Sequence, residues 1–549
     1  MIFGLGNITE VDSLIIRWAT GEEELIFGFA LNNYLELKQS EAVIKFKKPS
    51  TLQQPILTDI TNSIEIDYSH EENTFIEFSR EPFIPHFVST EGPAVAVADV
   101  NEDGLDDLFL GGAKFQAGAI YLQTSAGGFI KADVADMEND SRSEDVDATF
   151  LDADGNGTVD LYVASGGNEF FAKAEPLLDR LYLNDGTGNF QRSAGSLPAL
   201  FANTAKVVTL DFDADGDIDI FAGSRSVPRT YGIIPESYLL INDGSGKFSE
   251  QTDVIAPGLK KAGLITDAIS TDLNTDGQPD LVLAGEWMPI RTFLNQNGRF
   301  KEQTTAAGLS EQLGWWYSLA AADFNSDGIM DIAAGNLGLN SILKASTTAP
   351  VELWIHDFSA NDKPEQLLTR SKNGQAYPLI DSEKILTEIP ALQQKYLNFT
   401  EFAGKSIQEM FSSDELSKAK VLKANTFAST LFTGSKEGSF TASHLPTTAQ
   451  FSPLHAMLAV DINRDGYTDL FTAGNMFGTP TERGRYDASY GDIFLGTKNG
   501  MLLSPSIKQS GIAISDEVRF IREIEISGSG TAYLIARNNN FPVFYSASK

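Results

Sequence analysis

Six copies of a nine-residue acidic pattern, Asp-x-Asx-x-Asx-Gly-x-x-Asp, are the residues of this chain best suited to chemistry. In a tight turn, side chains at positions 1, 3 and 5 direct oxygens at one centre. Position 7 offers a backbone carbonyl and position 9 adds a last Asp. Ca²⁺ takes roughly six to eight oxygen ligands, so this donor set predicts about six calcium ions. The predicted ligands are Asp99, Asn101, Asp103, Leu105, Asp107, Asp152, Asp154, Asn156, Thr158, Asp160, Asp211, Asp213, Asp215, Asp217, Asp219, Asp272, Asn274, Asp276, Gln278, Asp280, Asp323, Asn325, Asp327, Ile329, Asp331, Asp461, Asn463, Asp465, Tyr467 and Asp469.

A glycine at position 6 of every copy allows the positive φ that such a turn needs. An EF-hand begins similarly but needs a Glu at position 12 and flanking helices. Position 12 is never acidic here, so EF-hands are excluded. The alternative is a set of metal-free turns, because Asp, Asn and Gly favour turns in any case. Six copies with one spacing favour calcium, in a structural role that fixes each turn.

Short apolar runs stand before and after each acidic turn and predict the strands that position it. A Gly- and Asn-containing hairpin with an aromatic second arm follows, as in RLYLNDGTGNF from Arg180. Each repeat therefore predicts four antiparallel strands, and the first five copies begin about 50–60 residues apart. The predicted fold class is all-β, a β-propeller of four-stranded blades.

The repeats predict eight blades, with seven as the close rival. Eight requires the stretch at 357–365, DFSANDKPE, to be the acidic loop of a degenerate blade and not a tight turn. The last blade would take three strands from 518–545 and its fourth from 74–78. Pairing the first and last segments in one blade would close the ring and remove its edges.

Two regions lie outside this pattern. Residues 1–50 form a separate β-rich piece, followed by a linker at 51–72 and the propeller at 73–549. Within the propeller, residues 373–425 predict a helical insertion, which we expect to pack as a cover on one blade. Its apolar positions at helical spacing are Ile385, Ile389, Leu392, Tyr396 and Phe399.

The composition narrows the partners of the chain. Its 41 Lys and Arg against 75 Asp and Glu give a formal net charge of −34. Nucleic acid and anionic bilayers would be repelled by this charge. The absence of cysteine excludes disulfides and thiolate chemistry. No apolar run reaches the roughly 18 residues of a membrane helix, and no signal peptide is visible.

The N-terminal segment MIFGLGNITEVDSLIIRWATG resembles the closing half of an ASPIC/UnbV domain, with Ala19 where that family prefers proline. The remainder resembles the FG-GAP/VCBS repeat propellers of cartilage-acidic-protein-like chains, including the phrases GEWMP, GWW, GNLGLN and LPTTAQFSP. The resemblance implies the C-terminal part of a longer bacterial protein, exported or anchored at the outer membrane. Some relatives are associated with nutrient-uptake complexes, so such a complex is an expected partner.

Catalysis finds little support in the residues. The five histidines are scattered without metal spacing, and no GxSxG, HExxH or P-loop motif is present. We therefore expect a binding module for a protein or a glycan, not an enzyme. A lyase-like, polysaccharide-active enzyme on a propeller scaffold and a structural spacer remain the alternatives, because fold does not settle function.

A binding face is predicted from the connections between strands. The acidic turns join the first and second strands of each blade, so the long loops after the second strand lie on the opposite face. Aromatic and Arg residues, which recognition surfaces enrich, gather in those loops. The alternative for Trp287 and Trp316 is that they fill the gaps between adjacent blades. The predicted ligand-binding residues are Arg225, Arg229, Tyr231, Trp287, Trp315, Trp316, Arg483 and Arg485.

Overall fold

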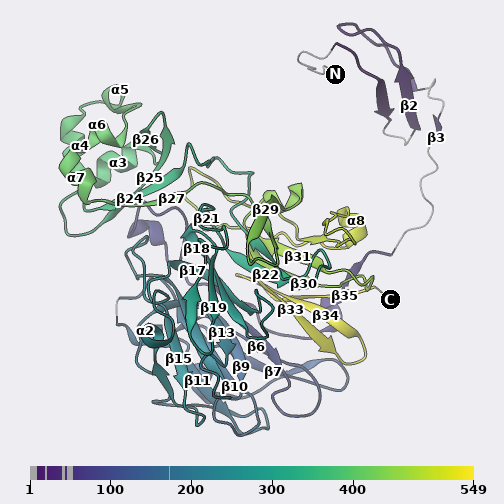
Figure 1. Ribbon diagram of the computed structural model, residues 1–549, viewed down its shortest axis with the longest axis vertical. Helices are drawn as coiled ribbons and strands as arrows, with labels where there is room; N and C mark the ends of the chain where they lie inside the picture. Colours follow the sequence, from purple (N-terminus) through teal and green to yellow (C-terminus); the bar gives the residue numbers. More distant parts are fainter. Residues whose placement is uncertain (1–8, 19–21, 40–43, 46–53, 172, 549) are drawn as a thin grey trace. The chain divides into compact units, whose positions relative to one another are not determined.

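The computed structural model describes residues 9–18, 22–39, 44–45, 54–171 and 173–548 (Figure 1). The chain divides into two compact units, Met1–Gln54 and Pro55–Lys549. The larger unit thus begins well before residue 73, where the sequence placed the start of the propeller. The difference arises because the segment from Pro55 contributes a strand to the propeller.

The smaller unit contains a three-stranded antiparallel sheet of β1 (Ser13–Arg17), β2 (Glu22–Phe27) and β3 (Ile44–Lys45). The side chains of Leu14, Ile16 and Trp18 are half-buried. Exposed apolar side chains of β1 and β2 are Ile15, Leu25 and Phe27. The FGLG segment at 3–6 and Ala19 lie outside the described residues.

Seven of the sheets formed by the described residues are propeller blades, and each strand pairs antiparallel with its neighbours. From the inner to the outer strand, the blades are β5 (Val95–Ala98), β6 (Asp107–Leu110), β7 (Ala119–Gln123) and β8 (Phe129–Lys131); β9 (Glu144–Leu151), β10 (Asp160–Gly166), β11 (Arg180–Asn184) and β12 (Phe190–Arg192); β13 (Asn203–Leu210), β14 (Asp219–Ser226), β15 (Tyr238–Asn242) and β16 (Phe248–Glu250); β17 (Leu264–Thr271), β18 (Asp280–Met288), β19 (Arg291–Asn295) and β20 (Phe300–Glu302); β22 (Ser318–Ala322), β23 (Asp331–Gly335), β28 (Thr430–Gly434) and β29 (Phe440–His444); β30 (Leu454–Val460), β31 (Asp469–Gly474) and β32 (Asp492–Phe494); and β33 (Val518–Ile526), β34 (Gly530–Arg537), β35 (Val543–Ala547) and β4 (Leu57–Asp59).

The blades form a closed ring, because each innermost strand contacts the next and β33 contacts β5. The last blade takes its outer strand, β4, from the beginning of the unit, where Leu57 lies opposite Ala547. Closure by the two ends of the chain was predicted correctly, but the strand predicted at 74–78 was wrong. That segment instead enters a short 3₁₀ turn, η3 (Glu77–Ser79).

The predicted count of eight blades is wrong, and its rival of seven is correct. One more four-stranded sheet of the larger unit, in the order β26-β25-β24-β27, is inserted between β23 and β28 and takes no place in the ring. The loop at 357–365 joins its first two strands, so it belongs to neither a blade nor a blade turn. The strands are β24 (Val351–His356), β25 (Glu365–Lys372), β26 (Gln375–Pro378) and β27 (Lys420–Ala424).

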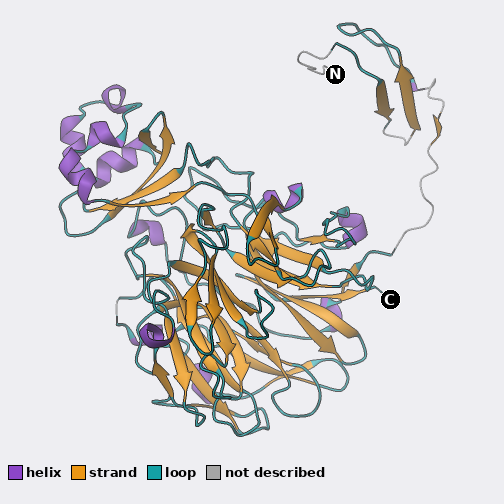
Figure 2. Ribbon diagram, viewed as in Figure 1, coloured by secondary structure: helices purple, strands orange, loops and turns teal. Residues whose placement is uncertain are grey.

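Short helices complete this insertion, as expected for 373–425, and Figure 2 shows them gathered beside its sheet. Of the five predicted apolar positions, four are buried. The prediction is wrong for Phe399, whose side chain is exposed. The helices are α3 (Ser382–Glu388), α4 (Pro390–Lys395), α5 (Phe399–Phe402), α6 (Ile407–Met410) and α7 (Ser413–Lys418); elsewhere lie α1 (Ala135–Asn139), α2 (Thr252–Ile255), α8 (Ile507–Ser510) and the short strand β21 (Gly314–Trp315).

Apolar side chains pack between adjacent blades. Phe212 and Phe221 of the third blade, for example, share one cluster with Ile265 and Phe293 of the fourth. Burial of such side chains is worth about 1.5–3 kcal/mol each, so the ring is a rigid support for its loops. None of the helices formed by the described residues is long and apolar enough to span a membrane.

Candidate metal loops and binding face

The six acidic turns share one backbone conformation. In each, the carboxylate at position 1 accepts backbone N–H groups of the same turn; Asp272 accepts those of Asp276 at 3.2 Å and Gly277 at 2.8 Å. Position 4 has φ between 58° and 71° in all six, although five of the residues there are not glycine. A positive φ at a non-glycine residue is strained and persists only where surrounding contacts hold it. The conformation of these turns is therefore fixed by the fold.

Two of the turns gather their carboxylates closely enough to hold a cation together. Oxygens of Asp152, Asp154 and Asp160 lie within 4.8 Å of one another, and so do those of Asp211, Asp213 and Asp215. Like charges this close repel one another strongly at low dielectric unless a cation lies between them. Carboxylate oxygens are also the ligands that Ca²⁺ prefers. The residues present therefore fit a hard divalent cation.

The Asp at position 9 has a second role that the sequence analysis missed. It is fully buried in every turn, and each of its two oxygens accepts a backbone N–H. In Asp280, Oδ2 accepts from Leu273 at 3.0 Å and Oδ1 from Asn295 at 2.7 Å, at the end of β19. The carboxylate thus ties the turn to the third strand of its blade. The same pair of contacts is made by Asp107, Asp160, Asp219, Asp331 and Asp469.

The loop at 357–365 has the same shape, although it lies in the inserted sheet. Asp357 accepts the N–H groups of Asn361 at 2.9 Å and Asp362 at 2.8 Å. Glu365 accepts the N–H of Phe358 at 2.7 Å, in the place of the ninth Asp. Asp362 adopts the positive φ, 62°, that glycine adopts in the other turns.

Most of the residues predicted to bind a ligand are buried, and their predicted exposure is wrong. Arg225 donates from Nε to Glu91 at 2.7 Å, and its Nη1 lies 3.3 Å from Glu286. Glu286 also accepts from Tyr231, whose hydroxyl accepts in turn from Trp287 Nε1 at 2.8 Å. These side chains form one internal network. A buried charge is costly unless it has a partner of opposite charge, and Glu91 and Glu286 are that partner for Arg225.

Trp287, Trp315 and Trp316 all pack inside the protein, which for Trp287 and Trp316 agrees with the alternative given above. Trp315 meets the ring of Trp287 edge-on, with centroids 4.9 Å apart, and Trp316 meets Phe432 at 5.6 Å. Three predicted residues keep access to the surface. Arg229 and Arg483 are half-buried and Arg485 is exposed.

An aromatic cluster on the long-loop face was missed by the sequence analysis. Phe115, in the β6–β7 loop, and Phe171, in the β10–β11 loop, are 69% and 67% exposed. Lys114 lies over Phe115 and Phe170, with Nζ 5.1 and 4.7 Å from the ring centroids, and Arg229 lies 4.1 Å over Phe171. We call Lys114, Phe115, Phe170, Phe171 and Arg229 the Phe115–Phe171 cluster.

The phenylalanines of this cluster lie in GGAKFQAG and GGNEFFAKAEP, two of the long loops after a second strand that the sequence places on the binding face, but they were not among the predicted ligand-binding residues. Phenylalanine is usually buried, so its type alone gives no sign of exposure. Phe115 also has a positive φ of 74°. A non-glycine residue in this conformation at an exposed position is typical of functional sites.

Comparison with known proteins supports the repeats. Residues 152–222 and 272–334 match the family described as FG-GAP-like repeat. Similar solved structures include chains from the crystal structures of BBS1N in complex with ARL6DN, soaked with lead (11% identity) or with mercury (9%). Each has a TM-score of 0.40 and covers 86% of this chain and 98% of that chain. No curated protein matched.

Proposed function

We propose that this chain is a calcium-stabilised, non-catalytic binding module that recognises a protein or glycan through its long-loop face. The observation that carries this proposal is the Phe115–Phe171 cluster, exposed on loops of a closed ring of FG-GAP-like repeats. Aromatic and Arg side chains dominate the energy of recognition surfaces. A rigid ring lowers the ordering entropy that binding would otherwise cost.

Calcium would act on the opposite face in this proposal. The ions would be held by the carboxylates at positions 1, 3, 5 and 9, and would neutralise charges that repel one another within each turn. Bound calcium stabilises the folded state by mass action, since the unfolded chain has no preformed site. The ring, and with it the spacing of the binding loops, would therefore depend on calcium.

The chemistry of the cluster indicates its partner. Cations stacked on aromatic rings present an apolar surface beside a charged group. Lys114 pairs with Glu169 at 2.8 Å, whereas Arg229 has no carboxylate within 4.0 Å among the described residues and supplies the positive charge. An acidic or polar partner would meet little repulsion there. By the family resemblance, the chain would act outside the cell or at the bacterial surface, with an outer-membrane uptake complex as the candidate partner.

A double variant, Phe115→Ser with Phe171→Ser, tests the face. Candidate partners, glycans on an array and proteins of the uptake complex, would be bound to the wild-type chain in calcium and then to the variant. We expect the variant to lose at least tenfold in affinity for any partner found, because truncating an aromatic hot spot typically costs about 2 kcal/mol or more.

Ile130→Ser is the matched control, since Ile130 is 63% exposed but lies on the outer strand β8. It should bind like the wild type. A double variant that binds as tightly as this control would overturn the assignment of the face.

A further inference from the structure

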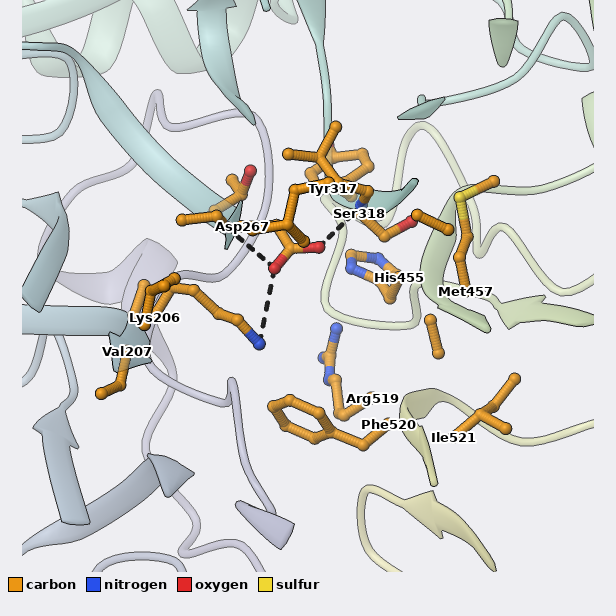
Figure 3. Close-up of a pocket in the computed structure, with 18 of the residues that line it drawn as sticks. Lys206, Val207, Asp267, Tyr317, Ser318, His455, Met457, Arg519, Phe520 and Ile521 are labelled. Atoms are coloured by element: carbon orange, nitrogen blue, oxygen red, sulfur yellow. Dashed lines mark hydrogen bonds and ion pairs between the residues drawn. The ribbon is translucent and has the colours of Figure 1, made fainter. Parts of the chain in front are cut away.

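The axis of the ring holds a cavity of about 500 Å³ lined by the inner strands β13, β17, β22, β30 and β33. Small-molecule sites usually have about 300–1,000 Å³, so the space suits a ligand the size of a sugar. Figure 3 shows Lys206, Asp267, His455 and Arg519 turned toward the same space. These groups come from four different blades, so the cavity exists only in the closed ring.

Several polar atoms of the cavity wall have no hydrogen-bond partner within the protein. Arg519 Nε, Arg225 Nη1 and His455 Nε2 are all shielded from the surface in this way, as is the acceptor Glu91 Oε2. The Arg225 atom lies 3.3 Å from Glu286, but outside hydrogen-bonding geometry. Buried polar groups are almost always hydrogen-bonded, so the wall around the cavity has hydrogen-bonding capacity that contacts within the chain leave unused. The two arginine nitrogens can only donate, Glu91 Oε2 accepts, and the imidazole nitrogen of His455 can do either.

The electrostatic environment agrees with an acceptor ligand. Burial lowers the pKa of His455 well below its usual range, and the positive charges of Arg519, Arg225 and His86 lower it further. Several cations of the wall are paired with carboxylates: Lys206 with Asp147 and Asp267, Arg225 with Glu91 and Glu286, and Arg519 with Glu517. Arg522 has no such partner within 4.0 Å among the described residues. Asp267 and Glu91 line the same space, so a doubly charged anion would be repelled more than a singly charged one.

The wall also offers what a sugar ring needs. Phe520 presents an aromatic ring, with Lys206 Nζ 5.1 Å from its centroid and the Arg522 guanidinium 4.8 Å from it. Asp267 accepts backbone N–H groups from Ala268 at 2.9 Å and Leu319 at 2.7 Å, and it lies 3.4 Å from Lys206. Carboxylates held in place like this have lone pairs left for the hydroxyl groups of a ligand.

We propose that the axial cavity binds a monosaccharide-sized sugar carrying one carboxylate, either free or at the end of a polymer. Arg522, with Lys206 and Arg519, holds the carboxylate. Asp267 and Glu91 accept the hydroxyl groups. This deepens the binding function proposed above and rests on it, but uses a surface separate from the Phe115–Phe171 cluster.

Calorimetric titration of the full chain in calcium tests this proposal with D-glucuronate, D-glucose and acetate. Glucuronate and glucose differ at C6, where one has a carboxylate and the other a hydroxymethyl group. We expect glucuronate to bind at least tenfold more tightly than either, because a charge-assisted hydrogen bond is worth roughly 1.5–3 kcal/mol. Equal binding of glucose would refute the role of the carboxylate, and equal binding of acetate would refute the sugar. No glucuronate binding to the wild-type chain would overturn the proposal.

Two variants locate the site. Arg519→Gln should weaken glucuronate binding about tenfold or more, but Arg519 also donates to the carbonyl of Thr90 at 2.9 Å and its loss could unfold the chain. Arg522→Gln avoids this difficulty, because Arg522 is half-buried and has no carboxylate within 4.0 Å among the described residues. It should weaken binding several-fold with an unchanged melting temperature.

Arg299→Gln, at an exposed site outside the cavity, is the matched control and should bind like the wild type. Arg522→Gln that binds glucuronate as tightly as this control would overturn the site. The Phe115→Ser, Phe171→Ser double variant should keep full glucuronate affinity. Loss of partner binding in that variant is thus separable from loss of the axial site.

Discussion

The carboxylate of Asp160 accepts the backbone N–H of Asn184 at 2.8 Å and so joins the acidic turn of its blade to the end of β11. Its other oxygen accepts the N–H of Ala153 at 3.0 Å, inside the turn. The residue that closes the predicted calcium cage therefore also holds two strands of the blade together. Substitutions within one turn should accordingly divide into two classes.

Asp160→Ala should destabilise the chain even when EGTA removes calcium, by about 1–3 kcal/mol, because two buried N–H groups lose their acceptor. Asp154→Ala should cost stability only in calcium, since Asp154 accepts one exposed N–H, from Asn156 at 3.2 Å. Chemical denaturation with and without EGTA measures both. Equal losses for the two variants in EGTA would contradict a separate role for Asp160.

Closure of the ring by β4 predicts a strong effect at Leu57, whose side chain is fully buried. Leu57→Ala should lower the free energy of unfolding by about 2–5 kcal/mol, because it removes core packing in the blade that joins both ends of the unit. Thr58→Ala, at an exposed neighbour in the same strand, is the control and should change it by less than about 0.5 kcal/mol. A small effect at Leu57 would mean that β4 does not close the ring.

The internal network around Glu286 predicts a cost in stability. Glu286 has no exposed surface and contacts His86, Tyr231 and Arg225. Those contacts hold its pKa at about 2 against the opposing effect of burial. Glu286→Gln should lower the free energy of unfolding by about 3–5 kcal/mol, because the buried Arg225 then loses one of its two carboxylate partners.

Glu302→Gln is the matched control for Glu286, since Glu302 also pairs with an arginine, Arg291, but at a more exposed site. It should cost no more than about 1 kcal/mol. The denaturation midpoints of the two variants measure both losses of stability. Equal losses would show that the network around Glu286 contributes no more than a more exposed ion pair.

Stability should fall in acid partly through His70. Burial, assisted by the charge of Arg519, lowers the pKa of His70 to about 3. The unfolded chain takes up a proton at this residue below about pH 6.5, whereas the folded chain does so only near pH 3. The free energy of unfolding therefore decreases as pH falls through this window, by at most about 1.4 kcal/mol per pH unit.

His70→Gln should flatten that decrease between pH 6.5 and 4, as followed by urea denaturation at each pH. His444→Gln is the control, because His444 is exposed and in the outer strand β29. The two variants should differ in slope. Parallel curves would show that His70 is not buried in the neutral form.

Much of this fold could be predicted from sequence, and the exceptions have physical causes. Each blade repeats its acidic turn and its hairpin, so local patterns suffice to place the strands. The blade count failed because the loop at 357–365 has the local pattern of a blade, while only the tertiary contacts put it outside the ring. Arg225 and Trp315 were expected at the surface because their residue types are common in recognition loops, and burial depends on distant partners such as Glu91 and Glu286.

The most direct test is the amount of calcium bound per chain, measured by elemental analysis after dialysis against calcium and then against calcium-free buffer. The six turns predict about six ions, with Asp152→Ala reducing the number by one. EGTA should lower the melting temperature by many degrees, and Mg²⁺ should restore it poorly, because it demands a stricter octahedron. A chain that binds no calcium and melts identically in EGTA would contradict the account.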